Sequence, residues 1–410
     1  MTASQAPVAA RDVPLASWTQ SVGMSALQDA LKLASRPGII SFALGLPSPE
    51  LFPIEKFKSS YQNVLLSGSR TLQYGRPSEE LKSHLVSVMR RRGIRCKESE
   101  IFLTQGAQQA IHLLAKLLMD NGRQIITENL CYPGFWQNLK FYAPEALLVS
   151  TDPQSGMDVE RVGWFLKSGS RPALIYVIPD GHNPTGASLS EEKREYLLRL
   201  ARFYGTPLLE EDPYGLLSYL DGQTVALRAR DHEQVFYVGS MSKILAPSLR
   251  IGWLVAPERY MPYLEILKES SDINMATLSQ HVVANMLAND WLSPHLATLQ
   301  IEYKQRRDAM LTAIHLFLPS GSECVAPNCG IYIWVRLPGN VDTRQFLEAA
   351  VSNYGVSFMP GDAFCIGERE TSQNCMRLSF SSPSVDQITE GLNRLSDAIS
   401  SCGGCRSIAR

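Results

Sequence analysis

The sequence GSMSKILAPSLRIGWLVAP, residues 239–257, is the stretch that decides the fold. It begins at the end of a short apolar run, 235–239, that has the composition of a buried strand. Four polar side chains follow in close succession: Ser240, Ser242, Lys243 and Arg250. A lysine amine can form an imine with a cofactor aldehyde, and hydroxyl groups together with a guanidinium bind phosphate. The stretch therefore holds the side chains that a phosphorylated aldehyde cofactor needs.

Short apolar runs and amphipathic segments alternate on both sides of this stretch. The runs that predict strands are 101–104, 124–128, 146–150, 173–178, 207–210, 235–239 and 251–256. The segments that predict helices are 21–35, 77–92, 107–120, 133–142, 159–167 and 189–204. Strands separated by helices of this length are typical of βαβ units, in which helices cover both faces of a parallel sheet. The sequence therefore predicts an α/β fold with a mostly parallel sheet.

The end of the chain has a different pattern. A long helical region, 258–318, is followed by two alternating segments, 330–336 and 376–381, that predict antiparallel strands. Helices are predicted beside them at 343–353 and 385–400. We therefore expect a smaller α+β domain at this end. The predicted division is an N-terminal arm with part of the small domain at 1–55, a large cofactor-binding domain at 56–300 and a C-terminal small domain at 301–410.

The bulk composition argues against several other classes of protein. The 39 lysines and arginines nearly balance the 40 aspartates and glutamates, so nucleic acid is not an expected partner. No apolar stretch has the length of a membrane span, and residues 1–18 lack the pattern of a signal peptide. We therefore expect no membrane partner and a cytoplasmic location. None of the seven histidines has metal-ligand spacing, and Cys402 and Cys405 lie in a glycine-rich tail without further ligands nearby, so no metal site is predicted.

The stretch 239–257 also resembles a known family. It is similar to the lysine segment of fold type I aminotransferases that depend on pyridoxal 5′-phosphate (PLP), and most similar to the branch with 2-aminoadipate and kynurenine aminotransferases. Further family motifs follow in the expected order, so the resemblance spans residues 20–397 approximately. It implies a large domain with a seven-stranded sheet, and PLP held as a Schiff base on Lys243.

The resemblance implies a phosphate site built from two segments. In TQGAQQA, residues 104–110, Ala107 and Gln108 are expected to contact the cofactor phosphate. They lie at a predicted helix start, where backbone N–H groups favour an anion. The lysine stretch contributes the remaining phosphate ligands: Ser240, Ser242 and Arg250.

Two more motifs are expected to hold the cofactor ring. In ENLCYPG, residues 128–134, Tyr132 has the position of the aromatic side chain that stacks on the pyridine. In NPTG, residues 183–186, Asn183 is expected to donate to the phenolic oxygen of the cofactor and to border the substrate. The NPTG motif follows a predicted parallel strand, at whose carboxyl end ligands of open α/β sheets bind.

The segment LEEDPY, residues 209–214, leaves two acidic residues open for one role. The family places an acid three residues before a tyrosine. The acid pairs with the protonated pyridine nitrogen, and the tyrosine contacts the phenolic oxygen. Counting back from Tyr214 reaches Glu211, where the family has aspartate, and Asp212 is adjacent. Because neighbouring side chains of a strand point to opposite faces, we favour Glu211, with Asp212 as the alternative.

Three residues are assigned to the substrate and to a partner subunit. Arg377, an arginine within the apolar run CMRLSF, is expected to bind the α-carboxylate of the amino acid in a bidentate contact. Gly45 is expected to line the substrate side. Tyr74, in YGRP, resembles the tyrosine that reaches the phosphate of the neighbouring subunit, which implies a homodimer with shared sites.

The favoured function is an aminotransferase that moves the α-amino group of an L-amino acid to a 2-oxo acid. In this reaction Lys243 acts as general base and acid, and Glu211 or Asp212 keeps the pyridine protonated. The same cofactor and fold also support β- or γ-elimination, replacement and carbon–carbon bond formation, and departures from the family pattern such as Glu211 keep that alternative open. A third hypothesis is a PLP-binding regulator, for which the near-neutral charge gives no support.

Overall fold

The computed structural model of the chain describes Leu15, Thr19 and residues 38–401, apart from Asp221, Gln223 and Arg369. The predicted helix at 21–35 and the pair Cys402 and Cys405 lie outside the described residues. In the part of the chain that is described, no helix is both long enough and apolar enough to cross a membrane.

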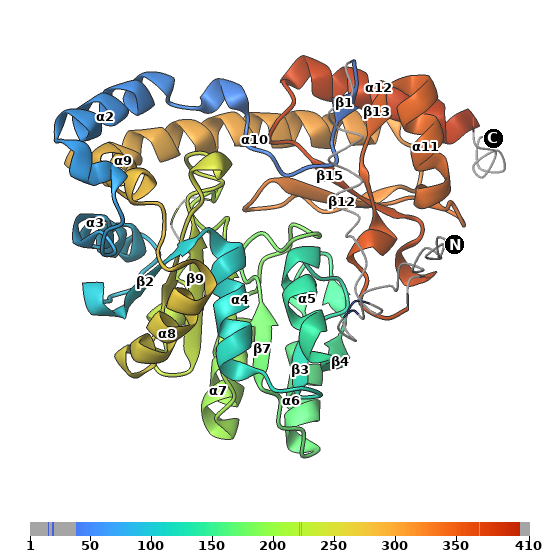
Figure 1. Cartoon of the computed structure of the whole chain (residues 1–410). Coiled ribbons are helices and arrows are strands. Elements are labelled where there is room, and N and C mark those ends of the chain that lie inside the picture. Colours follow the sequence, from blue (N-terminus) through green and yellow to red (C-terminus); the bar gives the residue numbers. More distant parts are fainter. Residues whose placement is uncertain are drawn as a thin grey trace, which may run out of the picture.

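A seven-stranded sheet forms the centre of the larger part of the molecule (Figure 1). Its strands are, in spatial order, β2 (Ile101–Gln105), β10 (Ile251–Val255), β9 (Val235–Ser240), β8 (Leu208–Asp212), β7 (Leu174–Val177), β3 (Gln124–Glu128) and β4 (Glu145–Val149). All are parallel except β10, which runs antiparallel to both of its neighbours. The predicted α/β fold with a mostly parallel sheet is therefore confirmed.

The reversed direction of β10 follows from a short connection. Residues 241–250 join β9 to β10 and contain one 3₁₀ turn, Pro247–Leu249. A parallel crossover needs a dozen or more residues and usually a helix, so a connection of this length returns the chain beside β9 in the opposite direction. This connection is the lysine stretch itself, and it lies beyond the carboxyl end of β9.

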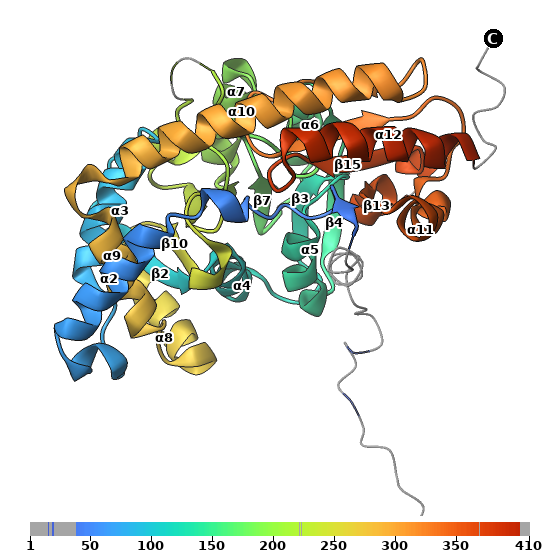
Figure 2. The ribbon, with the colours of Figure 1, turned by 90° about the horizontal axis from the view of Figure 1, so that it is seen from above.

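Helices cover both faces of this sheet (Figure 2). One face carries α4 (Ala107–Leu118), α5 (Pro133–Leu139) and α8 (Met261–Asp272), and the other carries α6 (Val159–Lys167) and α7 (Glu191–Tyr204). Successive side chains of a strand point to opposite faces of the sheet, so neighbouring residues pack into different apolar layers. Ile125 and Leu209 pack with the first group of helices, whereas their neighbours Ile126 and Leu208 pack with the second.

A smaller four-stranded sheet holds the C-terminal part of the chain. Its order is β11 (Glu323–Cys324), β12 (Tyr332–Arg336), β15 (Cys375–Ser379) and β14 (Met359–Pro360), and its pairs are antiparallel. The helices beside it are α11 (Thr343–Tyr354), α12 (Val385–Ser401) and the 26-residue α10 (Leu292–Phe317), which also extends over the larger part (Figure 1). The predicted small α+β unit is thus present. Its predicted boundary, between residues 300 and 301, falls inside α10.

Residues near the N-terminus close the gap between the two sheets. The strand β1 (Ile40–Ser41) pairs in parallel with β13 (Val356–Ser357). The next residue, Phe42, receives a 2.8 Å hydrogen bond at its carbonyl oxygen from the backbone of Ser379. The chain then continues through 43–46 into the region between the sheets, and so the first and last described parts of the chain meet there.

The remaining elements surround this framework. They are α2 (Ile54–Leu66), α3 (Glu79–Arg90) and α9 (Thr277–Leu287), which pack together, and the short strands β5 (Thr151–Asp152) and β6 (Gly156–Met157). The long helical region predicted at 258–318 is divided into α8, α9 and α10. The breaks lie at Ile273 and Asn289, whose φ angles of 62° and 59° are left-handed and cannot continue a helix. The sequence did not single out α2 or the two-residue strands.

Candidate active site

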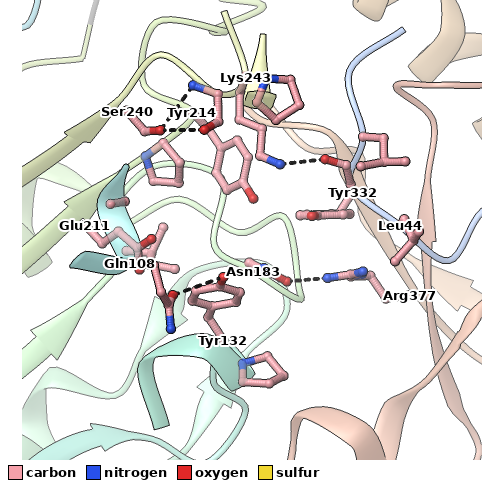
Figure 3. Close-up of a pocket in the computed structure, with 18 of the residues that line it drawn as sticks. Leu44, Gln108, Tyr132, Asn183, Glu211, Tyr214, Ser240, Lys243, Tyr332 and Arg377 are labelled. Atoms are coloured by element: carbon pink, nitrogen blue, oxygen red, sulfur yellow. Dashed lines mark hydrogen bonds between the residues drawn. The ribbon is translucent and has the colours of Figure 1, made fainter. Parts of the chain in front are cut away.

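A cavity of about 270 Å³ opens where the parallel strands β7, β8 and β9 end (Figure 3). Its walls come from both sheets and from the segment 44–46. The predicted site residues that line it are Gly45, Ala107, Gln108, Tyr132, Asn183, Glu211, Tyr214, Ser240, Ser242, Lys243, Arg250 and Arg377. Two predicted residues, Asp212 and Tyr74, do not line it. Residues more than 300 positions apart in the sequence, such as Gly45 and Arg377, are therefore brought together at the carboxyl edge of the sheet, where the motifs were expected to meet.

Lys243 projects into the middle of this cavity. Its Nζ atom donates a 2.6 Å hydrogen bond to the carbonyl oxygen of Gly45. Burial lowers the pKa of Lys243 because it disfavours the ammonium form, and the positive charges of Arg377 and Arg250 lower it further, although Tyr332 and Glu211 act in the opposite direction. A lysine with a lowered pKa is a better nucleophile and a better proton acceptor near neutral pH than a surface lysine.

One end of the cavity is built to bind an anion. The helix α4 begins after Gly106, and no side chain of the described residues caps it, so its first backbone N–H groups are available. Ser240 and Ser242 also line the cavity, and their hydroxyl oxygens are 3.0 Å apart. The guanidinium of Arg250 packs against Gly106, where a Cβ atom would lie 2.5 Å from Nη2. Glycine at 106 therefore lets a cation lie directly beside a helix N-terminus.

Glu211 and Asp212 face opposite sides of the sheet. Glu211 points into the cavity, and its carboxylate accepts a short hydrogen bond from the hydroxyl of Tyr176. Burial raises the pKa of Glu211 to about 7, although the bond from Tyr176 and the charge of Lys243 oppose this shift. Asp212 points away: its carboxylate accepts from Arg92 Nε at 2.6 Å and from the backbone of Gly215 at 2.7 Å.

The carboxylate of Asp212 belongs to a buried charge network behind the cavity. Arg92, which is fully buried, joins Asp212 to Asp180 through ion pairs of 2.6 and 2.5 Å. Arg194 pairs with the other oxygen of Asp180 at 2.6 Å. Since each charge has a partner of opposite sign, the network is satisfied without a ligand. The carboxylate of Asp212 is therefore held by partners within the fold, whereas the carboxylate of Glu211 faces the open cavity.

The far end of the cavity holds a second anion site. Arg377 donates from Nη1 to Asn183 Oδ1 at 2.7 Å and from Nη2 to the carbonyl oxygen of Ala43 at 2.6 Å. Its Nε atom is buried and has no hydrogen-bond partner among the described residues. The guanidinium lines the cavity and carries a positive charge, which suits a ligand carboxylate.

The aromatic side chain predicted to stack on the cofactor is held by its own turn. Tyr132 precedes α5, and its ring folds over Gly134, where a Cβ atom would lie 2.4 Å from the ring. Gln108 donates a 2.7 Å hydrogen bond to the carbonyl oxygen of Gly134 and so ties this turn to the start of α4. Tyr132 therefore lines the cavity in a fixed position.

A buried pair joins the two loops that carry Tyr132 and Asn183. Glu128, at the end of β3, lies 3.2 Å from Nε2 of His182 through one of its carboxyl oxygens. Burial raises the pKa of Glu128 to about 8 and lowers the pKa of His182 to about 3. Both shifts favour the uncharged forms of the acid and the imidazole, so burial opposes an ion pair at this contact.

Tyr74 lies on the outside of the molecule. Its side chain is 83% exposed and borders a groove with Arg76, Lys82 and Ile273, away from the cavity of its own chain. The structure thus does not bring Tyr74 to the site of its own subunit.

The substrate side contains residues that the sequence did not single out. They are Leu46, Ile178, Tyr332, Met359 and Phe364. Tyr332 and Arg377 lie on neighbouring strands, because Tyr332 pairs with Ser379 and Trp334 with Arg377. Strand alternation places positions two apart on the same face, so the pairing register, had it been known, would have predicted that Tyr332 lies beside Arg377.

The arrangement fits the predicted cofactor. An anion site at one end suits its phosphate, a cavity-facing carboxyl group suits its ring nitrogen, and the amine of Lys243 suits its aldehyde. The guanidinium of Arg377, which also lines the cavity, suits a carboxylate. Among the described residues no cluster of three or more potential metal ligands was found.

Comparisons with known proteins agree with this geometry. A family model described as aminotransferase class I and II matches residues 39–395. An aromatic-amino-acid aminotransferase of Thermococcus litoralis is 36% identical over 391 residues, which cover 93% of each chain. The structure of kynurenine aminotransferase from Pyrococcus horikoshii, in complex with PMP, is 33% identical with a TM-score of 0.88 and covers 95% of this chain and 97% of that one. α-Aminoadipate aminotransferase from Thermus thermophilus, complexed with N-(5′-phosphopyridoxyl)-L-leucine, is 28% identical with a TM-score of 0.85 and covers 94% and 99%.

Proposed function

Because the chain belongs to the class I and II aminotransferases, we propose how its side chains divide the work of transferring an amino group. The family resemblance inferred from the sequence is confirmed. The protein is a PLP-dependent aminotransferase acting on amino acids and 2-oxo acids, and the relatives do not favour elimination, replacement or carbon–carbon bond formation. PLP, when bound, supplies an aldehyde that takes the amino group and a ring that accepts electrons from the α-carbon.

The observation that carries the assignment is the place of Lys243 between two anion sites. On one side lie the start of α4 and Arg250, and on the other lies Arg377 with its unpartnered Nε atom. We assign the first site to the cofactor phosphate, with Ala107, Gln108, Ser240, Ser242 and Arg250 as ligands. The second is assigned to the α-carboxylate of the substrate.

The two catalytic residues act on protons at defined atoms. Lys243 would hold the cofactor aldehyde, and its Nζ atom would take and return the α-proton of the amino acid. Its lowered pKa supports this role, because the neutral amine is the form that accepts a proton. Glu211 would hold the proton of the cofactor ring nitrogen. Asp212, the alternative, is less suited to this role because its carboxylate accepts a hydrogen bond from Arg92. A positive ring nitrogen beside Glu211 would favour its ionised form.

Three further residues orient the ring and the substrate. Tyr132 would pack on the cofactor ring, and Asn183 and Tyr214 would face its phenolic oxygen. Asn183 also fixes the guanidinium of Arg377 through the 2.7 Å bond. Gly45 leaves room beside Lys243, since a Cβ atom there would collide with Tyr332.

We propose that the preferred substrates are amino acids with large apolar or aromatic side chains. The wall next to Arg377 consists of apolar side chains: Leu44, Leu46, Met359 and Phe364. Among the described residues that line the cavity, the cations are Lys243, Arg250 and Arg377, and all three already have a role. An acidic substrate side chain would therefore meet apolar surface. The aromatic-amino-acid aminotransferase of Thermococcus litoralis, at 36% identity, supports this choice.

The oligomeric state and the cellular location of the protein are also proposals. A homodimer with shared sites is supported by the exposed apolar residues of segment 65–74, which include Leu66, Leu72 and Tyr74. In it Tyr74 would reach the phosphate site of the neighbouring subunit. A cytoplasmic location is supported by five of the described cysteines, Cys96, Cys131, Cys324, Cys329 and Cys375, which form no disulfide. The division at residues 55/56 and 300/301 into arm, large domain and small domain stays a proposal, which limited proteolysis would test.

The decisive experiment combines a transfer assay with a trapping assay. The purified holoprotein is mixed with a panel of L-amino acids, with and without 2-oxoglutarate, and glutamate formation is measured. We expect glutamate from phenylalanine, tyrosine and leucine, and little transfer from aspartate. Borohydride reduction followed by peptide mass mapping is expected to place the cofactor on Lys243.

Two variants serve as test and control. Lys243→Ala is expected to lose both the trapped cofactor and the transfer of amino groups. Lys193→Ala, on α7 and bonded to Ser155, is expected to keep both. If Lys243→Ala retained the covalently trapped cofactor, the assignment of Lys243 would be wrong.

A further inference from the structure

Tyr332, the first residue of β12, lies against the backbone that holds Lys243. It is buried and lines the cavity. A Cβ atom at Gly45 would come 1.8 Å from its hydroxyl oxygen, so this oxygen occupies the space that the glycine leaves. The carbonyl oxygen of the same glycine accepts the hydrogen bond of Lys243 Nζ. The glycine at position 45 therefore allows a phenol to lie beside the reactive amine.

The hydroxyl and the ring of Tyr332 contact different neighbouring side chains. The hydroxyl is hydrogen-bonded to the hydroxyl of Tyr214, and the two rings meet edge to face with centroids 5.8 Å apart. The ring lies 4.0 Å from the guanidinium carbon of Arg377, which is a cation–π contact. Figure 3 shows Tyr332 between Tyr214 and Arg377, below the end of Lys243. One side chain thus touches both the cofactor side and the carboxylate side of the cavity.

The charges around Tyr332 favour its oxygen as an acceptor. Burial by itself raises the pKa of Tyr332, but the positive charges of Arg377 and Lys243 and the bond from Tyr214 lower it below its ordinary value, against the smaller effect of Glu211. Burial and the neighbouring Tyr332 instead raise the pKa of Tyr214 well above its ordinary value. In this pair Tyr214 therefore donates and Tyr332 accepts.

We propose that Tyr332 is a positioning residue of the reaction, whose hydroxyl oxygen, an acceptor beside Lys243, orients Tyr214, and whose ring holds the guanidinium of Arg377. The inference rests on the roles proposed above for Lys243 and Arg377. It assigns two separable effects to one side chain: loss of the hydroxyl should act on proton transfer, and loss of the ring should act on carboxylate binding.

The first test measures the tyrosine itself in the full-length protein freed of cofactor. Tyrosinate absorbance is followed as the pH is raised for the wild type and for Tyr332→Phe. We expect one tyrosine of the wild type to ionise at lower pH than the others, and this early step to be absent from Tyr332→Phe. Gly45→Ala, whose new methyl group displaces the hydroxyl, is expected to lose the early step as well.

Tyr303→Phe is the matched control. Its hydroxyl is buried outside the cavity, 3.4 Å from the backbone nitrogen of Ser48. This variant is expected to keep the early step. An early step that persists in Tyr332→Phe would overturn the proposal, and it would do so whether or not Lys243 carries the cofactor, because this measurement uses the cofactor-free protein.

The second test separates hydroxyl from ring in the holoenzyme. Tyr332→Phe is expected to lower kcat roughly tenfold, to change KM for the amino acid less than about twofold, and to shift the pH profile of kcat. Tyr332→Leu, which also removes the ring, is expected to raise KM roughly tenfold in addition. If both variants changed only kcat, and by the same factor, the role of the ring would be refuted. An unshifted pH profile in Tyr332→Phe would refute the role of the hydroxyl.

Discussion

Glu211 and Asp212 are neighbours in β8, but their side chains point to opposite faces of the sheet and therefore have different surroundings. Glu211 faces the cavity with a pKa raised to about 7, and Asp212 faces Arg92 in the network behind it. Strand alternation was enough to predict that only one of the two could reach a ligand. The partner of Asp212 could not be predicted, because Arg92 is 120 residues away in the sequence and lies just beyond α3.

These different surroundings predict different effects of two conservative substitutions. Glu211→Gln is expected to lower kcat about 100-fold, because an uncharged amide cannot hold a proton on the ring nitrogen, and to leave thermal stability nearly unchanged. Asp212→Asn is expected to destabilise the protein by about 2 kcal/mol, because it leaves part of the charge of Arg92 uncompensated. Steady-state kinetics and urea unfolding of both variants provide the measurements. The reverse pattern would make Asp212 the partner of the ring.

Arg377 gives a second prediction at this scale. Arg377→Lys keeps the charge but removes the planar pair of donors, and hydrogen bonds to charged groups contribute about 1.5–3 kcal/mol. KM for the amino acid and for the oxo acid is therefore expected to rise roughly tenfold to 100-fold. Arg336→Lys, in the same pair of strands but half exposed beside Glu323, is the control and should leave KM unchanged. An unchanged KM in Arg377→Lys would place the carboxylate elsewhere.

At the scale of elements, the ends of β3 and β7 are linked by two uncharged groups. Glu128 closes β3, His182 precedes the NPTG turn, and their contact holds the loops that carry Tyr132 and Asn183. Neither residue was assigned a role from sequence, because Glu128 was quoted only as the first residue of the Tyr132 motif and His182 only precedes the NPTG motif. Their shared burial depends on the spatial neighbourhood of β3 and β7, which the order of strands in the sequence does not reveal.

The raised pKa of Glu128 predicts how stability depends on pH. In the folded state the carboxyl group keeps its proton up to pH 8 approximately, whereas in the unfolded chain it loses it around its ordinary value of 4.5. The folded state thus binds more protons in this window, and its stability falls as pH rises, by up to about 1.4 kcal/mol per pH unit. Glu128→Gln cannot ionise, so the stability of the wild type relative to this variant should decline between pH 5 and pH 8.

Urea unfolding at several pH values measures this difference directly. Because both proteins share every other titrating group, their difference isolates Glu128. Parallel stability curves would mean that Glu128 is ionised in the folded state.

Most helices and strands could be predicted from the spacing of apolar residues, but the directions of the strands and their pairing could not. The strand and helix patterns gave β3 and α6 with their observed bounds, since buried runs and amphipathic segments are local signals. The direction of β10 depends instead on the length of a connection. The contact of Tyr332 with Arg377 depends on the register of β12 and β15, which no local pattern contains. For this reason Tyr332, Met359 and Phe364 could not be singled out from the sequence, whereas the cavity residues that lie within recognisable motifs could.

At the scale of the whole molecule, the exposed Tyr74 predicts complementation between subunits. If Tyr74 serves the neighbouring site, Tyr74→Ala and Lys243→Ala each impair every site of their own homodimer. A mixed dimer has one site with both residues intact. Co-expression of the two variants should therefore restore about one quarter of the wild-type activity, as half of the dimers would be mixed.

The transfer activity of the co-expressed protein is compared with the activities of the two variants purified separately. Tyr263→Ala, an exposed tyrosine on α8, replaces Tyr74→Ala in the control pairing. Its homodimer should be active by itself. Failure of the Tyr74 and Lys243 variants to complement one another would place Tyr74 outside the neighbouring site.

The meeting of β1 with β13 and of Phe42 with Ser379 has a consequence for how the enzyme is made on the ribosome. The strands of the large sheet have all been synthesised once residue 255 is complete, but Arg377 comes more than a hundred residues later. The partner strand of β1 also comes late, at Val356–Ser357. Most residues proposed to hold the cofactor therefore leave the ribosome well before the residue proposed to hold the substrate carboxylate.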